Sequence, residues 1–333
     1  MERPKSTTQE VDLPLPPARA ATLASGHGRP VLGRPMRHAD LAQCAGLLPG
    51  WIEIEPQVRS ALPVIWTRLL GQPGFSADVI DDVSRPPGHR LVGLGVTVAL
   101  DERWQTRMRN APPAHAGAHW YREFLQGVTA PLDDRSLGRA NAAGEVSMLV
   151  LHYGQIAIDA EHPEVQQVLL KAINLFRVAH GGFQLREVWQ EAMGEGGDYL
   201  LGMGFRRQLT RPEGLPDLYG LTREEAATMF PGTPVRDVFQ FVPPVLRFSG
   251  AERRVLRLAV AGFQDEEIAD ELGVTGHTLK KVWRAVFVRA GEQLPGIFSD
   301  PAHAAGDGTR GPEKRRHLLQ FLREHPQELR PWV

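Results

Sequence analysis

The fold of this 333-residue chain is decided most clearly by residues 249–291, which read SGAERRVLRLAVAGFQDEEIADELGVTGHTLKKVWRAVFVRAG. Ser249 followed by Glu252 is a capping box, and apolar residues then recur at helical spacing as far as Gly262. Three acidic residues open a second amphipathic run, which stops at Gly273. Thr275 then supplies the N-cap of a third helix. The stretch therefore predicts three helices joined by tight turns.

The third of these helices has two different faces. Its apolar residues point to a core, and no acidic residue occurs from Thr275 to Gly291. A short helix with a basic exposed face suits the major groove of DNA, which admits one helix and is lined by phosphates. The sequence thus predicts double-stranded DNA as a partner. The predicted DNA-contacting residues are His277, Thr278, Lys280, Lys281 and Arg284, with Ser249 and Thr275 as helix caps.

The same stretch resembles the LuxR-type helix-turn-helix of bacterial transcription regulators. The resemblance spans a stretch of about 43 residues, and residues 248–262, 267–275 and 278–280 carry it. It implies a transcriptional regulator that acts as a homodimer. The chain departs from the family at Gln264, at Val282 and at residues 289–291, and Pro295 interrupts the expected dimer helix. An apolar stripe within residues 312–330 is the alternative dimer contact, made of Leu318, Phe321, Leu322 and Leu329.

Composition is that of an ordinary globular protein, with 38 Lys and Arg against 39 Asp and Glu. The single cysteine, Cys44, cannot form an internal disulfide, and no apolar run approaches the ~20 residues that cross a bilayer. We therefore expect a cytoplasmic protein with no membrane contact. Cys44 lies among leucines on a helix-like face, where an inert buried thiol is expected.

The whole chain predicts an α+β protein whose N-terminal mixed α/β domain is followed by a small all-α domain. Strand-like stretches occur at residues 90–100, 145–156 and 183–189, and an amphipathic helix follows His162. The expected divisions are a flexible tail at 1–30, an α/β sensory or interaction domain at 31–242 and a linker at 243–248. The helix-turn-helix then occupies 249–295, and a mobile stretch with a C-terminal helix occupies 296–333.

The α/β part can be compared with three kinds of sensory domain. Asp81 and Asp82 follow an apolar stretch, but the strand–helix repeat of a phosphorylated receiver is missing. Trp120 and Tyr121 are not followed by the Asp-Pro expected of a lactone-binding domain. Residues 34–46 and 199–206 resemble the first and closing segments of the GNAT acetyltransferases. The stretch Ile158–Glu164 departs from that family, because it has no glycine and its three acids would repel a coenzyme A pyrophosphate.

Other chemistry is sparse. His115 and His119 could clasp a metal from one helix, but Gly117 and the preceding prolines weaken that helix. His152 and Tyr153 end a buried strand and could line a pocket, although a hydrogen-bonded core histidine is the simpler reading.

The sequence therefore predicts a DNA-binding regulator that is not an enzyme and needs no cofactor or metal, controlled by an unknown small-molecule or protein signal at its α/β domain. Two alternatives stay open. One is a GNAT-type acyltransferase fused to a helix-turn-helix. The other makes the α/β domain a protein-interaction module without a small ligand.

Overall fold

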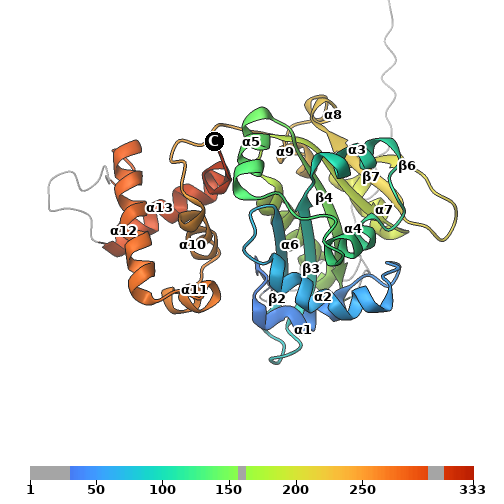
Figure 1. Cartoon of the computed structure of the whole chain (residues 1–333), viewed down its shortest axis with the longest axis horizontal. Helices are drawn as coiled ribbons and strands as arrows, with labels where there is room; N and C mark the ends of the chain where they lie inside the picture. The colour runs from blue at the N-terminus through green and yellow to red at the C-terminus, as the bar shows by residue number, and fades with distance from the viewer. Residues whose placement is uncertain (1–30, 157–162, 299–310) are drawn as a thin grey trace, which may run out of the picture.

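The computed structural model describes residues 31–156, 163–298 and 311–333. The predicted tail at 1–30 and most of the predicted mobile stretch lie outside the described residues. Figure 1 shows two units side by side, an α/β unit built around one sheet and a module of helices near the C-terminus. Within the described part, no helix is both long and apolar enough to cross a membrane.

One mixed sheet organises the α/β unit, with its strands in the order β1-β2-β3-β4-β5-β7-β6. Every neighbouring pair is antiparallel except β4 and β5, which are parallel. The predicted strands at 90–100, 145–156 and 183–189 correspond to β3, β4 and β5. The strands are β1 (Val31–Pro35), β2 (Phe75–Asp82), β3 (Leu91–Ala99), β4 (Val146–Gln155), β5 (Leu185–Ala192), β6 (Arg206–Leu209) and β7 (Asp217–Thr222).

Helices cover both faces of the sheet. The face of β1 to β3 that carries Ile80 and Val92 packs against α6. The opposite face packs against α1, α2 and α4. The helices of this unit are α1 (Leu41–Cys44), α2 (Pro56–Leu69), α3 (Glu102–Asn110), α4 (Ala116–Leu125), α5 (Asp134–Ala143), α6 (Pro163–His180), α7 (Glu195–Met203), α8 (Arg223–Ala227) and α9 (Pro234–Asp237).

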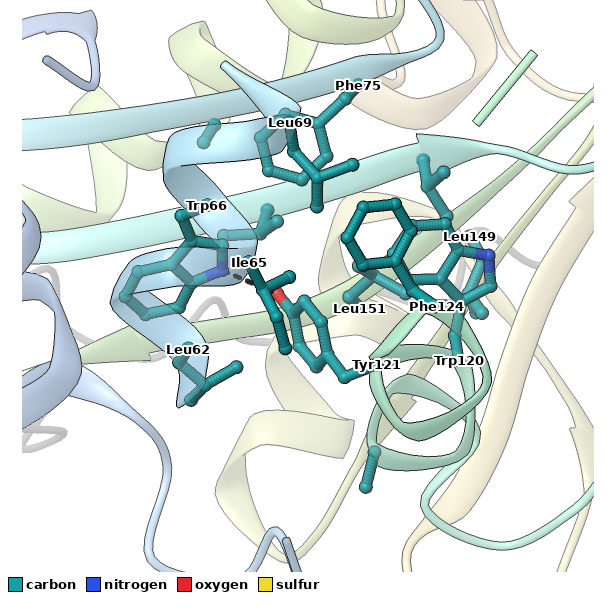
Figure 2. Packing of buried hydrophobic residues seen from close by; sticks show 14 of the residues in the cluster. Leu62, Ile65, Trp66, Leu69, Phe75, Trp120, Tyr121, Phe124, Leu149 and Leu151 are labelled. Atoms are coloured by element: carbon teal, nitrogen blue, oxygen red, sulfur yellow. Dashed lines mark hydrogen bonds between the residues drawn. The ribbon is translucent and has the colours of Figure 1, made fainter. Parts of the chain in front are cut away.

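The largest core cluster lies between α2, α4 and the sheet (Figure 2). Trp66 of α2 donates its indole N–H to the hydroxyl of Tyr121 at 3.1 Å. Both of these buried polar groups therefore have a hydrogen-bond partner. Trp120 and Phe124 stack with ring centroids 5.4 Å apart. Cys44 is fully buried, and burial raises the pKa of its thiol to about 12. This core fixes α4 against the sheet.

One glycine is needed for that close approach. A Cβ built on Gly117 of α4 would lie 2.1 Å from the carbonyl oxygen of Leu151 on β4. The sequence suggested that Gly117 weakens a helix. The structure shows that it lets α4 lie directly on the strand.

The C-terminal module contains the three helices expected from residues 249–291, namely α10 (Gly250–Val260), α11 (Asp265–Leu272) and α12 (Gly276–Gln293). Gly273 adopts the left-handed conformation between α11 and α12, with φ of 61°. The last helix, α13 (Gly311–Glu324), packs against α10 and is followed by the 3₁₀ turn Pro326–Leu329.

Two expectations for this module differ from the structure. Leu318 and Leu322 of the proposed dimer stripe are 0% and 1% exposed, because α13 buries them against its own module. Leu246 and Phe248 of the proposed linker are each 1% exposed and belong to the same core. These four apolar side chains therefore pack into the core of their own module and are not exposed.

The two units meet through buried polar groups. On the side of the module, Glu328 accepts hydrogen bonds from the backbone N–H groups of Val245 (2.9 Å) and Leu246 (2.7 Å), which hold the C-terminal segment to the start of the module. Arg330 donates to the carbonyl of Gly181 at 2.9 Å, and its guanidinium lies 4.5 Å from the ring centroid of Phe183. Arg257 of α10 and Arg330 both act electrostatically on Asp78, which is buried on β2. The C-terminal residues therefore attach the module to the sheet.

Candidate functional site

The parallel strands β4 and β5 separate partway along their length. Their backbones pair from Val146 opposite Leu185 to Val150 opposite Gln190. Beyond that point β4 pairs only with β3, as far as Gln155, and β5 pairs only with β7. Among the described residues, the inner edges of the two strands therefore have no strand partner there, and the sheet opens as a wedge.

A cavity of about 500 Å³ occupies this opening, a size typical of small-molecule sites. Residues from α6 and α7 line it, together with strands β2 to β5 and the Leu48–Trp51 loop on the other side of the sheet. Most lining side chains are apolar. The polar and ionisable ones are Asp78, Thr97, Tyr153, Gln155, His180, Gln190, Glu191, Glu195, Asp198 and Tyr199.

Two phenols enter the cavity from different elements. The hydroxyl of Tyr153 on β4 donates to Gln155 Oε1 at 2.7 Å, and that of Tyr199 on α7 donates to the carbonyl of Leu169 at 3.0 Å. Burial raises the pKa of both hydroxyls well above the ordinary tyrosine value. Both phenols therefore hold their protons at neutral pH, and each hydroxyl can donate a proton or a hydrogen bond.

His180 at the end of α6 is a neutral, oriented imidazole. Burial lowers its pKa to about 4. Nδ1 lies 2.8 Å from the carbonyl of Phe176, which requires Nδ1 to carry the proton. Nε2 is then an acceptor, 3.3 Å from the hydroxyl of Thr97. The ring also stacks on Phe176, so its position is fixed.

Glu191 on β5 is a carboxylate with an unusual pKa. Burial raises that pKa to about 7, although Arg211 at 2.9 Å opposes the shift. Its other oxygen accepts the backbone N–H of Ala116 at 2.6 Å. A carboxylate that titrates near neutral pH is suited to accept and return a proton.

Acidic residues outnumber basic ones among the residues that line the cavity. Asp78, Glu191, Glu195 and Asp198 line it, and no lysine or arginine is among its lining residues in the described part of the chain. The segment predicted to repel a pyrophosphate, Ile158–Glu164, lies largely outside the described residues. Burial also raises the pKa of Asp78, against the opposing fields of Arg257 and Arg330.

The residues predicted to contact DNA come together on one face of α12. His277, Thr278, Lys280, Lys281 and Arg284 are all exposed. Ser249 accepts the backbone N–H of Glu252 and so caps α10, and Thr275 accepts that of Thr278 at 3.2 Å and so caps α12. The basic face thus exists as a surface, and its contact with DNA stays a prediction.

The cavity residues were mostly missed from the sequence. Only Tyr153, at the end of its strand, and Tyr199, in the segment resembling a GNAT closing element, carried a signal. His152 is a core histidine, as the simpler reading expected, with Nε2 3.1 Å from the hydroxyl of Tyr121. Among the described residues, no group of three or more potential metal ligands includes His115 or His119.

No protein-family model matches the chain, and no curated protein matches it. Solved structures do. NAA60 of Arabidopsis thaliana, bound to a bisubstrate analogue, is 12% identical with a TM-score of 0.34, over 58% of this chain and 98% of that one. The aminoglycoside acetyltransferase AAC(6')-Ib, bound to coenzyme A, is 12% identical with a TM-score of 0.30, over 60% and 98%. A variant of the spermidine N-acetyltransferase SpeG from Vibrio cholerae is 9% identical with a TM-score of 0.34, over 58% and 93%.

These findings correct two predictions. The chain was expected not to be an enzyme, whereas the solved structures just described are acetyltransferases. Transcription regulation by DNA binding has no support among them. They agree with the GNAT-like fold expected of the α/β domain, and they do not confirm a LuxR-type helix-turn-helix.

Proposed function

We propose that the α/β unit is an acyltransferase that moves an acyl group from a thioester, of the acyl-coenzyme A kind, to a primary amine. The observation that carries this proposal is the wedge between β4 and β5, with its cavity of about 500 Å³. The unpaired inner edges of the two strands offer backbone N–H and C=O groups to the amides of an extended ligand. The apolar lining suits the acyl-pantetheine arm, and this arm is the part of the donor that the described residues fit.

The reaction needs one proton removed and one proton supplied. The amine nitrogen forms a bond to the thioester carbonyl carbon, the carbon–sulfur bond breaks, and the sulfur leaves as a thiol after taking a proton. Tyr199 holds its proton at neutral pH and lines the cavity, so we assign it the delivery of that proton. Glu191, with its pKa raised to about 7, is assigned the proton lost by the amine. The exposed acids of the cavity, Glu195 and Asp198, also favour a cationic acceptor.

The test is release of free thiol from acetyl-coenzyme A by the full chain in the presence of a panel of primary amines. Tyr199→Phe is expected to lower kcat roughly 100-fold with little change in the KM for the thioester, because only the hydroxyl is removed. Gly202→Ala is the matched control on the same helix, since a Cβ there meets nothing within 4 Å. Absence of thiol release with every amine, or an unchanged kcat in Tyr199→Phe, would contradict this assignment.

A further inference from the structure

A second cavity, of about 470 Å³, lies between α4 and the segment that leads into α2. It is a neighbour of the first cavity. Trp51 lines the first cavity, and its ring centroid lies 6.3 Å from that of His115, which lines the second. The full lining is Ile52, Glu53, Ile54, Glu55, Val58, His115, Ala118, His119 and Arg122.

His115 is held in a strained backbone conformation at this cavity. Its φ of 55° and ψ of 45° lie in the left-handed region, which residues other than glycine rarely adopt. The neighbouring backbone is clamped on both sides, because Arg211 donates to the carbonyl of Pro113 at 2.9 Å and Glu191 accepts the N–H of Ala116 at 2.6 Å. Strain of this kind persists only where the surroundings enforce it, and it concentrates at functional sites.

The imidazole of His115 carries an unused donor. The side chain is buried, with the residue 7% exposed, and Nδ1 accepts the backbone N–H of Glu53 at 3.3 Å. Burial also lowers the pKa of His115, so the neutral ring has one proton and that proton is on Nε2. Nε2 has no hydrogen-bond partner among the described residues. A buried donor without an acceptor is destabilising, and a bound acceptor would remove that cost.

A negative charge lies beside that donor. The Glu53 carboxylate is 3.9 Å from Nε2, which is too long for a hydrogen bond, and its side chain is 81% exposed. The neighbouring Glu55 is already paired with Arg122 at 2.8 Å. Within the described part of the chain, the rim of the cavity therefore presents one carboxylate, that of Glu53, without a cationic side chain paired to it. Apolar side chains of Ile52, Ile54, Val58 and Ala118 form the rest of the wall.

We infer that this second cavity binds a primary amine that carries an oxygen acceptor two or three bonds from its nitrogen, on an apolar body. The ammonium group pairs with Glu53, the oxygen accepts from His115 Nε2, and the apolar body lies on the isoleucine and valine side chains. The 3.9 Å between the two protein atoms requires that the two ligand groups be neighbours. β-Amino alcohols and α-amino amides have this form. The binding of this amine does not depend on the proposed function. Its role as the acyl acceptor rests on that function.

The experiment is calorimetric titration of the full chain at pH 7 with L-phenylalaninol, which is a cationic β-amino alcohol. Two probes each remove one group: 2-phenylethylamine has no oxygen, and N-acetyl-phenylalaninol has no cation. Each is expected to bind at least about tenfold more weakly than phenylalaninol, the loss for one hydrogen bond or ion pair in a cavity. Equal affinity of the three probes, or no binding of phenylalaninol at millimolar concentration, overturns the inference.

Two variants connect the binding to the residues. His115→Gly removes the donor and suits the left-handed backbone, so the chain is expected to fold while phenylalaninol binds at least about tenfold more weakly. Glu53→Gln is also expected to weaken phenylalaninol binding at least about tenfold. The control is Glu102→Gln, which changes an exposed glutamate at the start of α3 and is expected to leave the affinity unchanged. Unchanged affinity in His115→Gly or Glu53→Gln overturns the assignment.

Titration of the same samples with acetyl-coenzyme A separates this inference from the proposed function. Thioester binding without phenylalaninol binding overturns the inference alone. Phenylalaninol binding without thioester binding upholds the second site and contradicts the proposed function.

Discussion

The helical module and the α/β unit obtain their structure from different kinds of information. In the module, two helices begin at a residue whose side chain accepts a backbone N–H of the first turn: Ser249 caps α10 and Thr275 caps α12. In the α/β unit, the wedge-shaped cavity takes its walls from segments between Leu48 and Met203. Local contacts decide the first region, and long-range contacts decide the second.

This difference explains why the helices of the module were easier to predict from the sequence than the cavity of the α/β unit. The capping boxes and glycine turns of residues 249–291 predicted three helices correctly. The function attached to them, DNA binding, is not supported by the structures that the chain is similar to. The weaker resemblance at residues 34–46 and 199–206 predicted the α/β fold that holds the cavity.

The largest expected effect contrasts two glycines, one in each region. Gly117→Ala would place a Cβ 2.1 Å from the Leu151 carbonyl and force α4 away from β4, costing roughly 3 kcal/mol or more of unfolding free energy. Gly276→Ala in α12 meets nothing within 4 Å and is expected to change stability by less than about 1 kcal/mol. Urea unfolding measures both. Equal effects would mean that the two regions do not differ in how closely they are packed.

The second prediction separates the two regions from each other. Arg330→Met removes a buried cation that lies against Phe183 and donates to Gly181, and it leaves Asp78 with less compensation. The expected cost is about 3 kcal/mol, together with a split of thermal unfolding into two transitions. Arg323→Met, exposed on α13, is the control. A single transition at an unchanged temperature in Arg330→Met would show that the interface does not couple the units.

The third prediction concerns how the stability of the α/β unit changes as the pH falls. Since the pKa of His180 is lowered to about 4 in the folded chain, the unfolded chain binds a proton on this residue between pH 6.5 and about 4, where the folded chain does not. Stability from this residue is therefore lost as the pH falls through that window, by roughly 3 kcal/mol. In His180→Gln the fall in unfolding free energy between pH 7 and pH 4 should be smaller by that amount. An identical pH dependence in the variant would refute the buried, neutral imidazole.

The smallest expected effect is local to the module. Thr275→Ala removes the acceptor of the Thr278 N–H and should cost about 1 kcal/mol. Hydrogen exchange is expected to rise in the first turn of α12 and to stay unchanged in β4. Faster exchange in β4 would mean that the module is less autonomous than its local caps indicate.

The same contrast shows which features of the fold could be predicted from the sequence and which could not. Alternating and helical patterns placed β3, β4, β5 and the module helices, because each depends on side chains within one element. The wedge could not be predicted, since it depends on where two strands stop pairing after Val150 and Gln190. Nor could the left-handed backbone of His115, which Arg211 and Glu191 enforce from distant strands and loops. The stripe at Leu318 and Leu322 was recognised as apolar, but only the fold shows that its own module covers it.

The central claim is that the wedge between β4 and β5 holds an acyl thioester. The most direct measurement is calorimetric titration of the full chain with acetyl-coenzyme A, alongside Gly95→Val. A Cβ on Gly95 meets only Tyr153, at 3.8 Å, so valine suits the strand while its methyl groups enter the cavity. The account predicts binding by the unmodified chain and by Gly202→Ala, and at least tenfold weaker binding by Gly95→Val. Equal affinity in Gly95→Val, or no binding by the unmodified chain, would contradict it.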